Sequence, residues 1–550
     1  MRRTAVRACV LACVFAYVGV LPAASPAGSA SSSTSAPGVV IYTKDNAPAA
    51  PRLEDLPLKE SLSQYGITWT FEKPVRVGQF VNGDYYVVGP VTVTAVDPKT
   101  LRDKEVPEGE IGADEARWRK NDGKFVRNGS MHNPPAKPAS GLDSGIREYF
   151  RRELTADFPV QLKPGDALLS SISMKMGEQV SHINPSTEMT SRARDEASSV
   201  RTAAVLTCLA EPVPADAFRP SFCDREHKTI RLARDLKREL LLSLARVAET
   251  PKIADYARKT RRVWFDVTWF NFSSPVENVP RYGQANGRMM SNSGLLLCCD
   301  FTPREKEPLL IHLVQIGIDY WGVVRGGHIG WGAFGGHNSG RKFPIVFAGM
   351  LLGDDEMARV SKTLPKVGFG EDEQTAYGDC WTGAKVVWTG HSGIVAATGK
   401  PHADSEEGRK GFGPYEHITP DKWTRQNLIS EGYRTANTSS SWIGQALTIR
   451  LMHAEEIWAH DAFFDYCDRW MQEDDTPFRH EIAKTFPGHA PDESKFQQQR
   501  RTWDGWVDAM YAKYRPTLKA PMDGWKQKHD DRYYRNAIGT TQPATTAPKP

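Results

Sequence analysis

Hydrophobic and polar positions follow two different patterns along this 550-residue chain. From about residue 51 to 225, short β-branched and aromatic runs alternate with turn residues; within 67–98, for example, Asn-Gly-Asp and Gly-Pro separate such runs. Short apolar runs bounded by turn residues predict β-strands. Further strands are expected within 167–176 and 201–214, and a long polar loop over 108–140. This half of the chain therefore predicts a β-sandwich-like domain.

After Cys223, apolar residues recur at helical spacing. Several of the later apolar segments are hydrophobic on nearly every side, which is typical of buried helices, whereas the first two are amphipathic. Buried helices inside a layer of amphipathic ones indicate an (α/α) toroid, here of about four or five helix pairs, so that an incomplete ring is an option. The predicted fold class is α+β multidomain: a β-sandwich-like domain followed by an (α/α) toroid. The helices are predicted at 228–250, 252–270, 291–301, 306–324, 339–353, 440–452 and 455–472.

Three of the predicted helices start alike, with small polar residues before an apolar run: MSNSGLLLCC, HNSGRKFPIV and NTSSSWIGQA. In the first two, Ser293 and Ser339 are 46 residues apart, which is the length of one helical hairpin and the spacing of stacked helix pairs. An insertion rich in Gly, Trp, Tyr and His, at 361–435, separates the second from the third. In a toroid such helix starts line a central cleft, and we expect the functional site there.

The N-terminal end of the chain has a pattern of its own. A positive start, 14 apolar residues and small-residue cleavage sites near Ala24 or Ala30 are features of a secretory signal peptide. A membrane span needs about 20 apolar residues, so we predict a secreted or periplasmic protein without a membrane span. The predicted organisation is a signal peptide (1–30), a linker (31–50), a β-rich domain (51–225), a toroid catalytic domain (226–535) and a disordered tail (536–550).

Charge and motif content exclude several functions. The 70 Lys and Arg residues nearly balance the 66 Asp and Glu residues, and the net charge is +4. Without a basic block, we expect no nucleic-acid partner. The sequence has no phosphate-binding P-loop, no nucleophile elbow and no HExxH motif, which argues against nucleotide, esterase and zinc-protease chemistry.

The cysteines and histidines predict neither a metal site nor a cofactor. Six cysteines follow the predicted signal peptide, too few for a disulfide scaffold. Cys208 and Cys223 flank a proline-rich loop and are a candidate pair, whereas the adjacent Cys298–Cys299 are expected in the core. His453 and His460 would lie about 10 Å apart along one helix, too far to share a metal ion.

The helix start at 333–342, AFGGHNSGRK, combines little bulk with many hydrogen-bonding side chains. Helix N-termini present unsatisfied N–H groups and partial positive charge, which favours an anionic ligand. We therefore predict that His337, Asn338 and Arg341 face a cleft, and that the glycines let a ligand approach the backbone. An ordinary capped helix, with the histidine bonded to a neighbouring loop, is the alternative.

Polar and aromatic residues also gather in the stretches beside the other predicted helix starts, which include Gln284, Arg288 and Asn437. Aromatic surfaces beside Arg, Asn and His are what sugar rings with hydroxyl and carboxylate groups require. The predicted substrate-binding residues are Arg281, Asn286, Asn292, His328, Trp331, Asn338, Glu416, His417, Arg434 and Trp442.

With these loops and this architecture, residues 226–520 resemble secreted toroid-plus-β polysaccharide lyases, such as those that degrade alginate, chondroitin and heparin. The resemblance implies an acidic polysaccharide as substrate and cleavage by β-elimination at a uronic acid residue. Those lyases commonly carry the β-sandwich after the toroid, whereas here the predicted β domain comes first.

β-Elimination needs a group that neutralises the uronate carboxylate, a base for the C5 proton and an acid for the leaving oxygen. The predicted base is His337, and the predicted acid is Tyr282 or Tyr433. The predicted neutralising groups are Asn286, Asn338 and Arg341.

Two other functions fit the same chain. A glycoside hydrolase would need two carboxylic acids, about 5–5.5 Å apart if retaining and about 6.5–9.5 Å apart if inverting. The insertion offers Glu371, Asp372, Asp379 and Glu416. A non-catalytic glycan-binding protein would have a shallow cleft without convergent titratable groups. Elimination is favoured because the predicted helix starts are biased toward cationic residues.

Overall fold

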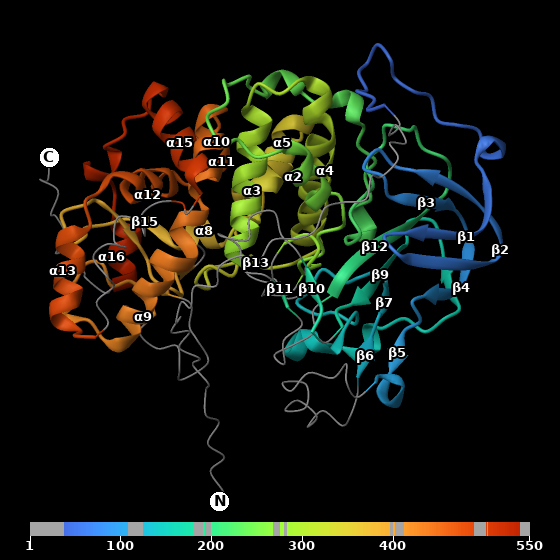
Figure 1. Cartoon of the computed structure of the whole chain (residues 1–550), viewed down its shortest axis with the longest axis horizontal. Coiled ribbons are helices and arrows are strands. Elements are labelled where there is room, and N and C mark those ends of the chain that lie inside the picture. The colour runs from blue at the N-terminus through green and yellow to red at the C-terminus, as the bar shows by residue number, and fades with distance from the viewer. Residues whose placement is uncertain are drawn as a thin grey trace, which may run out of the picture.

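In the computed structural model of the chain, a β-rich N-terminal part lies beside a helical C-terminal part (Figure 1). The predicted signal peptide at 1–30 lies outside the described residues, as does the predicted tail beyond Ile538. In the part of the chain that is described, no helix is long and apolar enough to cross a membrane. The structure describes residues 38–107, 125–175, 177–180, 191–192, 200–267, 275–279, 283–395, 400–401, 412–488, 502 and 504–538.

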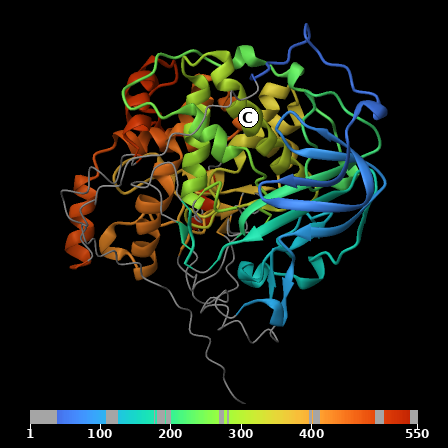
Figure 2. The same cartoon turned by 45° about the vertical axis from the view of Figure 1, so that its right-hand side comes forward.

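One sheet, eight-stranded in the described residues, forms the framework of the N-terminal part (Figure 2). Its order is β7-β9-β12-β3-β2-β4-β8, and β1 also pairs with β2. The β12–β3 pair is parallel, and the other neighbours are antiparallel. The strands are β1 (Leu58–Gln64), β2 (Ile67–Gln79), β3 (Tyr85–Val88), β4 (Val91–Asp97), β7 (Ser130–His132), β8 (Val160–Leu162), β9 (Ala167–Ser173) and β12 (Val200–Leu209).

The long strand β2 lets this sheet fold around one apolar core. Its first half, Thr68–Phe71, pairs with β4, and its end, Val77–Gln79, pairs with β3. The enclosed face buries alternating residues such as Trp69, whose indole N–H donates to Ser170 Oγ at 3.0 Å. The strands expected within 67–98, 167–176 and 201–214 are thus confirmed.

Short two-stranded ribbons add to the β structure of both parts. They are β5 (Leu101–Arg102) with β6 (Val126–Arg127), β10 (Gln179–Val180) with β11 (Ser191–Arg192), β13 (Gly330–Trp331) with β14 (Gly368–Phe369), β15 (Thr375–Tyr377) with β16 (Val386–Trp388), and β17 (Ile394–Val395) with β18 (Lys400–Pro401).

Buried helices form the centre of the C-terminal part. Among them α4 packs against α2 and α5, and α3 packs against α10. Nearly every residue of α3 and α5 is buried, which confirms the prediction of buried helices in this part of the chain. The helices are α2 (Ile253–Thr260), α3 (Gly283–Cys298), α4 (Pro303–Arg325), α5 (Lys342–Leu352), α6 (Asp355–Ala358), α7 (Val360–Thr363), α8 (Gly370–Glu373), α9 (Arg425–Tyr433), α10 (Ile443–Leu451), α11 (Glu455–Trp458), α12 (Asp461–Gln472), α13 (Thr476–Thr485), α15 (Gly505–Tyr514) and α16 (Arg532–Ile538).

The prediction of a helix over 228–250 is wrong. The segment runs across the helical part with only short 3₁₀ turns, because its backbone and arginines bind other elements. Lys237 N donates to Leu351 O at 2.7 Å. Ion pairs extend from this segment to three distant carboxylates: Arg231 to Asp354, Arg234 to Asp216 and Arg238 to Glu307. These long-range bonds replace the local bonds of a helix, and the apolar side chains pack on the core.

Two other predicted helices are shorter than expected. The one over 252–270 ends at Thr260. The one over 455–472 is interrupted at Ala459, whose φ of 63° is left-handed, so that α11 and α12 are separate helices. His453 therefore precedes α11 and His460 precedes α12, and the single helix expected to carry both histidines does not form.

The six described cysteines are free and buried, so the expected pairing of Cys208 with Cys223 is wrong. Cys208 Sγ faces Leu162 O at 3.7 Å inside the β core. Cys223 belongs instead to the core that the helices share with the rest of the β part. Cys298 and Cys299 are core residues, as predicted.

A buried arginine joins the two parts. Arg219 is fully enclosed, and its Nε lies 2.6 Å from Oδ2 of Asp84, in the turn between β2 and β3. Its two terminal nitrogens donate to both carboxylate oxygens of Asp319 in α4, at 2.9 and 2.6 Å. Gln315 of α4 also bonds the Arg219 backbone in both directions. The β part and the helical part are therefore linked by fully desolvated charges.

Replacing Arg219 with Ala should destabilise the protein by about 3–5 kcal/mol, because Asp84 and Asp319 would remain buried without their counter-ion. Arg246→Ala is the control, since the Arg246–Asp300 pair is exposed and such pairs contribute about 1 kcal/mol or less. Urea unfolding of the three proteins measures the difference. Equal losses in the two variants would contradict the structural role of Arg219.

Candidate functional site

The starts of α3, α5 and α10 meet in one place. A Cβ on Gly283, the first residue of α3, would lie 1.9 Å from the carbonyl oxygen of His337. A Cβ on Gly336 would lie 1.9 Å from the carbonyl oxygen of Asn437, in the turn before α10. These glycines therefore let backbone segments touch one another, whereas the sequence suggested that they admit a ligand. The three helix starts are brought together as expected, and their contact is direct.

A group of five rings lies beside this junction, and we call it the histidine–tyrosine cluster: Phe334, His337, His391, Phe412 and Tyr433. The Phe334 ring centroid lies 5.4 Å from that of His337 and 4.9 Å from that of His391. The His391 ring lies 4.5 Å from Tyr433 and 5.1 Å from Phe412. Phe334, His337 and Tyr433 are half-buried, whereas His391 is buried behind them. A half-buried histidine and a half-buried tyrosine thus belong to the same cluster.

Amide side chains border the histidine–tyrosine cluster. Gln284, on the first turn of α3, donates to Ala436 O at 2.5 Å, and Asn437 is the residue that follows Ala436 in the chain. Both amide side chains belong to half-buried residues. The loop of His391 is fixed from two sides, because Gly335 N donates to His391 O at 3.0 Å and Ser430 Oγ accepts from His391 N at 2.9 Å.

Arg341, a predicted catalytic residue, lies inside the protein. Its guanidinium is fully buried and bonds Asp266 through Nε at 2.9 Å and through Nη2. Its Nη1 donates to the carbonyl oxygens of His337 and Ser339, at 2.9 and 2.6 Å. Arg341 therefore holds the turn that presents His337, and it does not face solvent.

The other predicted residues near this turn are also internal. Asn286 is buried beside Arg341. Asn338 donates to Gly332 O at 2.7 Å. Asn292 donates to Tyr256 and Asp504, at 2.7 and 2.8 Å. Each amide thus has a structural partner within the protein.

His328 and Trp331 brace the loop before α5. His328 Nε2 bonds Val267 O at 3.0 Å, and its Nδ1 accepts from Gly330 N, also at 3.0 Å. Burial lowers the pKa of His328 to about 4, so the ring is neutral at physiological pH. The fully buried Trp331 donates from its indole nitrogen to Asp266 O at 2.9 Å.

Arg434 and Glu416, two of the predicted substrate-binding residues, belong to a buried ionic network. Arg434 binds Glu431 with two bonds of 2.7 and 2.9 Å. Glu416 accepts from Arg469 at 2.7 Å and from Trp388 N at 2.6 Å. These groups stabilise the fold beneath the histidine–tyrosine cluster.

Two further predicted residues are placed away from the cluster rings. Trp442 is fully buried and donates to Ser339 Oγ at 3.1 Å. His417 is half-buried, with Nδ1 3.1 Å from the Tyr534 hydroxyl, and burial lowers its pKa. The predicted Arg281 and Tyr282 lie outside the described residues.

The acids considered for a hydrolase have separate partners. Glu371 accepts from Gly340 N at the start of α5, and Asp372 binds Lys342 at 2.5 Å. Asp379 is exposed and pairs with Lys385, whereas Glu416 is paired with Arg469. Among the described residues, no group of three His, Cys, Asp or Glu side chains is arranged to hold a metal ion.

Sequence reasoning missed His391, Phe334 and Phe412 as members of the site. A usable signal was present: residues 336–340 read GHNSG and residues 390–393 read GHSG. Both histidines follow a glycine in a tight turn, and they share one aromatic neighbour, Phe334.

Comparison of the chain with protein-family models, curated proteins and solved structures gives no match.

Gly283→Ala should destabilise the protein by about 1–3 kcal/mol, because the added methyl group would push the His337 backbone away from α3. Gly432→Ala is the matched control. Gly432 lies in α9 with nothing within 4 Å of the Cβ position, so alanine should leave stability unchanged or raise it. Thermal unfolding compares them. A Gly283→Ala protein as stable as the control would contradict the close approach.

Glu371 should make stability depend on pH. Burial, with a smaller contribution from Asp372, raises its pKa from an ordinary 4.5 to about 7, against the opposing effects of the Gly340 N–H and Arg341. Between these values the folded protein holds a proton that the unfolded chain releases, so stability should fall as pH rises through this window. Glu371→Gln should remove this component and gain about 3 kcal/mol above the window.

Chemical denaturation across the same pH range tests the Glu371 prediction. The control is Glu456→Gln, since Glu456 is 86% exposed, and this variant should follow the wild-type curve. Parallel pH curves for Glu371→Gln and wild type would show that Glu371 does not titrate in this range.

Proposed function

We propose that the protein cleaves an acidic polysaccharide by β-elimination at a uronic acid residue. The observation that carries the proposal is that His337 and Tyr433, both half-buried, belong to one ring cluster. Phe334 contacts the rings of both His337 and His391, and His391 contacts that of Tyr433. Elimination requires a base and an acid in one site. Aromatic faces beside them suit the apolar faces of sugar rings.

In the proposed reaction, an imidazole nitrogen of His337 takes the C5 proton of the uronate. The electron pair of that C–H bond forms the C4–C5 double bond, and the glycosidic C4–O bond breaks. Tyr433 gives its phenolic proton to the departing oxygen. The amides of Gln284 and Asn437, which border the cluster, are suited to bind the uronate carboxylate and the charge that develops on it. These amides take the neutralising role, since Asn286 and Arg341 are buried.

The placement of the acids favours elimination over hydrolysis. A hydrolase needs one acid to protonate and a second to attack or to activate water. Here Glu416 is held by Arg469, Asp372 by Lys342 and Glu371 by Gly340 N. Glu371, Asp372 and Glu416 are thus each committed to a different internal partner, and Asp379 pairs with Lys385 at the surface.

The contact among α3, α5 and α10 also supports an (α/α) toroid, of which these helices would form one sector. Their starts meet on one side, as inner helices of a toroid do, and the proposed reaction occurs at that meeting point. Export by the proposed signal peptide would deliver the protein to extracellular or periplasmic polysaccharide.

His337→Ala and Tyr433→Phe should each lower kcat by about 100-fold or more, the range typical of lost acid–base catalysis. The controls are His480→Ala, on an exposed turn of α13, and Tyr514→Phe, and both should keep wild-type rates. The assay follows the ultraviolet absorbance of the unsaturated uronide formed from alginate, polygalacturonate or chondroitin. Full activity in both cluster variants, or no unsaturated product from any uronate polymer, would refute the proposal.

A further inference from the structure

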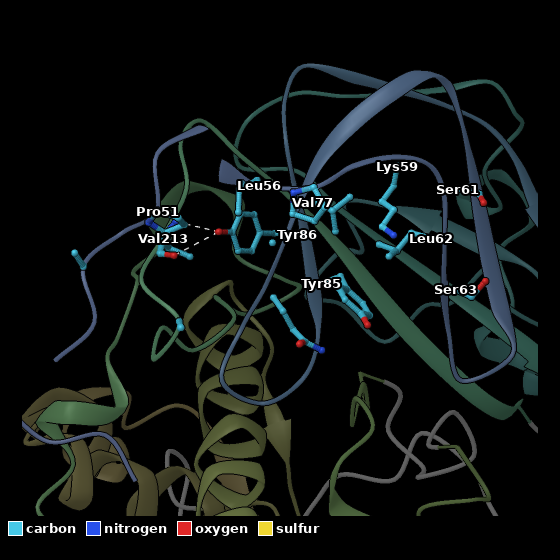
Figure 3. Close-up of a pocket in the computed structure, with 15 residues that line it drawn as sticks. Pro51, Leu56, Lys59, Ser61, Leu62, Ser63, Val77, Tyr85, Tyr86 and Val213 are labelled. Atoms are coloured by element: carbon cyan, nitrogen blue, oxygen red, sulfur yellow. Dashed lines mark hydrogen bonds between the residues drawn. The ribbon is translucent and has the colours of Figure 1, made fainter. Parts of the chain in front are cut away.

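A groove of about 650 Å³ lies on the outer face of the β part, away from the histidine–tyrosine cluster. It is bounded by the segments 49–63, 77–86 and 213–215 (Figure 3). This volume is within the range of about 300–1,000 Å³ that is usual for small-molecule sites. In Figure 1, β1 and β2 lie at the opposite side of the molecule from α9, which ends at Tyr433. The groove is therefore a separate surface.

A fixed tyrosine forms one wall of the groove. The Tyr86 ring lies across Gly78 so closely that a Cβ there would be 2.0 Å from the ring. The Tyr86 hydroxyl accepts from Val213 N at 3.2 Å, which ties this wall to the segment 213–215 (Figure 3). The ring also packs 5.1 Å from Phe80. The wall is thus preorganised before any ligand binds.

Most of the groove lining is apolar, and its polar groups include the ammonium group of Lys59, which is the one charged side chain among the lining residues. Lys59 and Ser61 lie on the exposed face of β1, and Lys59 extends over the groove toward Leu62 and Tyr85 (Figure 3). Gln79 is exposed at the end of β2, with its amide nitrogen bonded to a backbone carbonyl in the next turn. None of the 15 lining residues is acidic. A half-buried tyrosine, hydroxyls, an amide and one ammonium group suit a sugar chain that carries carboxylates.

We propose that this groove binds a uronate-bearing oligosaccharide and retains the polymer on the protein; the identity of the ligand rests on the proposed function. The proposed binding groups are side chains, two of them on β1, which pairs only with β2 among the described strands. An extended peptide would instead bond the open backbone edge of β1, and the test below distinguishes the two occupants. Lys59 binds a carboxylate, Tyr85 contacts a sugar face, and Ser61 and Gln79 bond hydroxyl groups.

The test is calorimetric titration of the full chain with tetrasaccharides of alginate, polygalacturonate and chondroitin. Lys59→Glu should weaken the groove affinity by about 10-fold or more, as expected for a lost charged hydrogen bond. Ser61→Trp should abolish groove binding by filling the space. Both residues are exposed, so neither change removes a core contact. Lys73→Glu is the charge-matched control on the same sheet; it does not line the groove and should bind as wild type.

Equal affinity in all four proteins, or no binding by wild type, would overturn the proposal. Binding of an extended uncharged peptide instead of saccharides, lost in Ser61→Trp, would also overturn it. Cleavage of the polymer without Lys59-dependent binding would overturn the groove proposal and leave the elimination proposal intact. Lys59-dependent binding without cleavage would overturn the elimination proposal and leave groove binding intact.

Discussion

The close approach of three helix starts is the constraint on which the candidate site depends. Gly283 lets α3 touch the His337 carbonyl, and Gly336 lets the same turn touch Asn437. Beneath them, the buried guanidinium of Arg341 binds the turn through its carbonyl oxygens. Because backbones in direct contact cannot shift independently, the rings carried by these turns keep a fixed mutual geometry. The protein therefore presents His337 and Tyr433 from segments whose backbones are in direct contact.

Buried charge explains why the surface of the site is rich in rings and amides. Arg219, Arg341 and Arg469 are all enclosed, and each is bound to at least one carboxylate. Charges removed from water are tolerated only when they are paired and hydrogen-bonded. These arginines and acids therefore serve the interior, and they hold loops and elements of distant sequence together. Among the described residues beside the helix starts, those that are only half-buried include His337, Tyr433, Gln284 and Asn437.

The sequence predicted the elements whose partners are local. The strands within 67–98 and the apolar helices at 306–324 and 339–353 follow from alternation and apolar runs. It failed for 228–250, where helical periodicity is overridden by bonds to residues far along the chain. The same limit applied to the site. Composition pointed to the loops at the three helix starts, but whether Arg341 or His337 faces solvent depends on Asp266, more than 60 residues away in sequence.

If the histidine–tyrosine cluster acts as proposed, the glycosidic bond breaks by elimination and without the addition of water. The most direct test is mass spectrometry of oligosaccharides released from a uronate polymer in oxygen-labelled water. Elimination adds no water, so the predicted new non-reducing ends are unsaturated and one water lighter than a hydrolysis product, with no label taken up in the cleavage step. Products that carry the heavy oxygen at the cleaved bond, with saturated ends, would contradict the account and show a hydrolase.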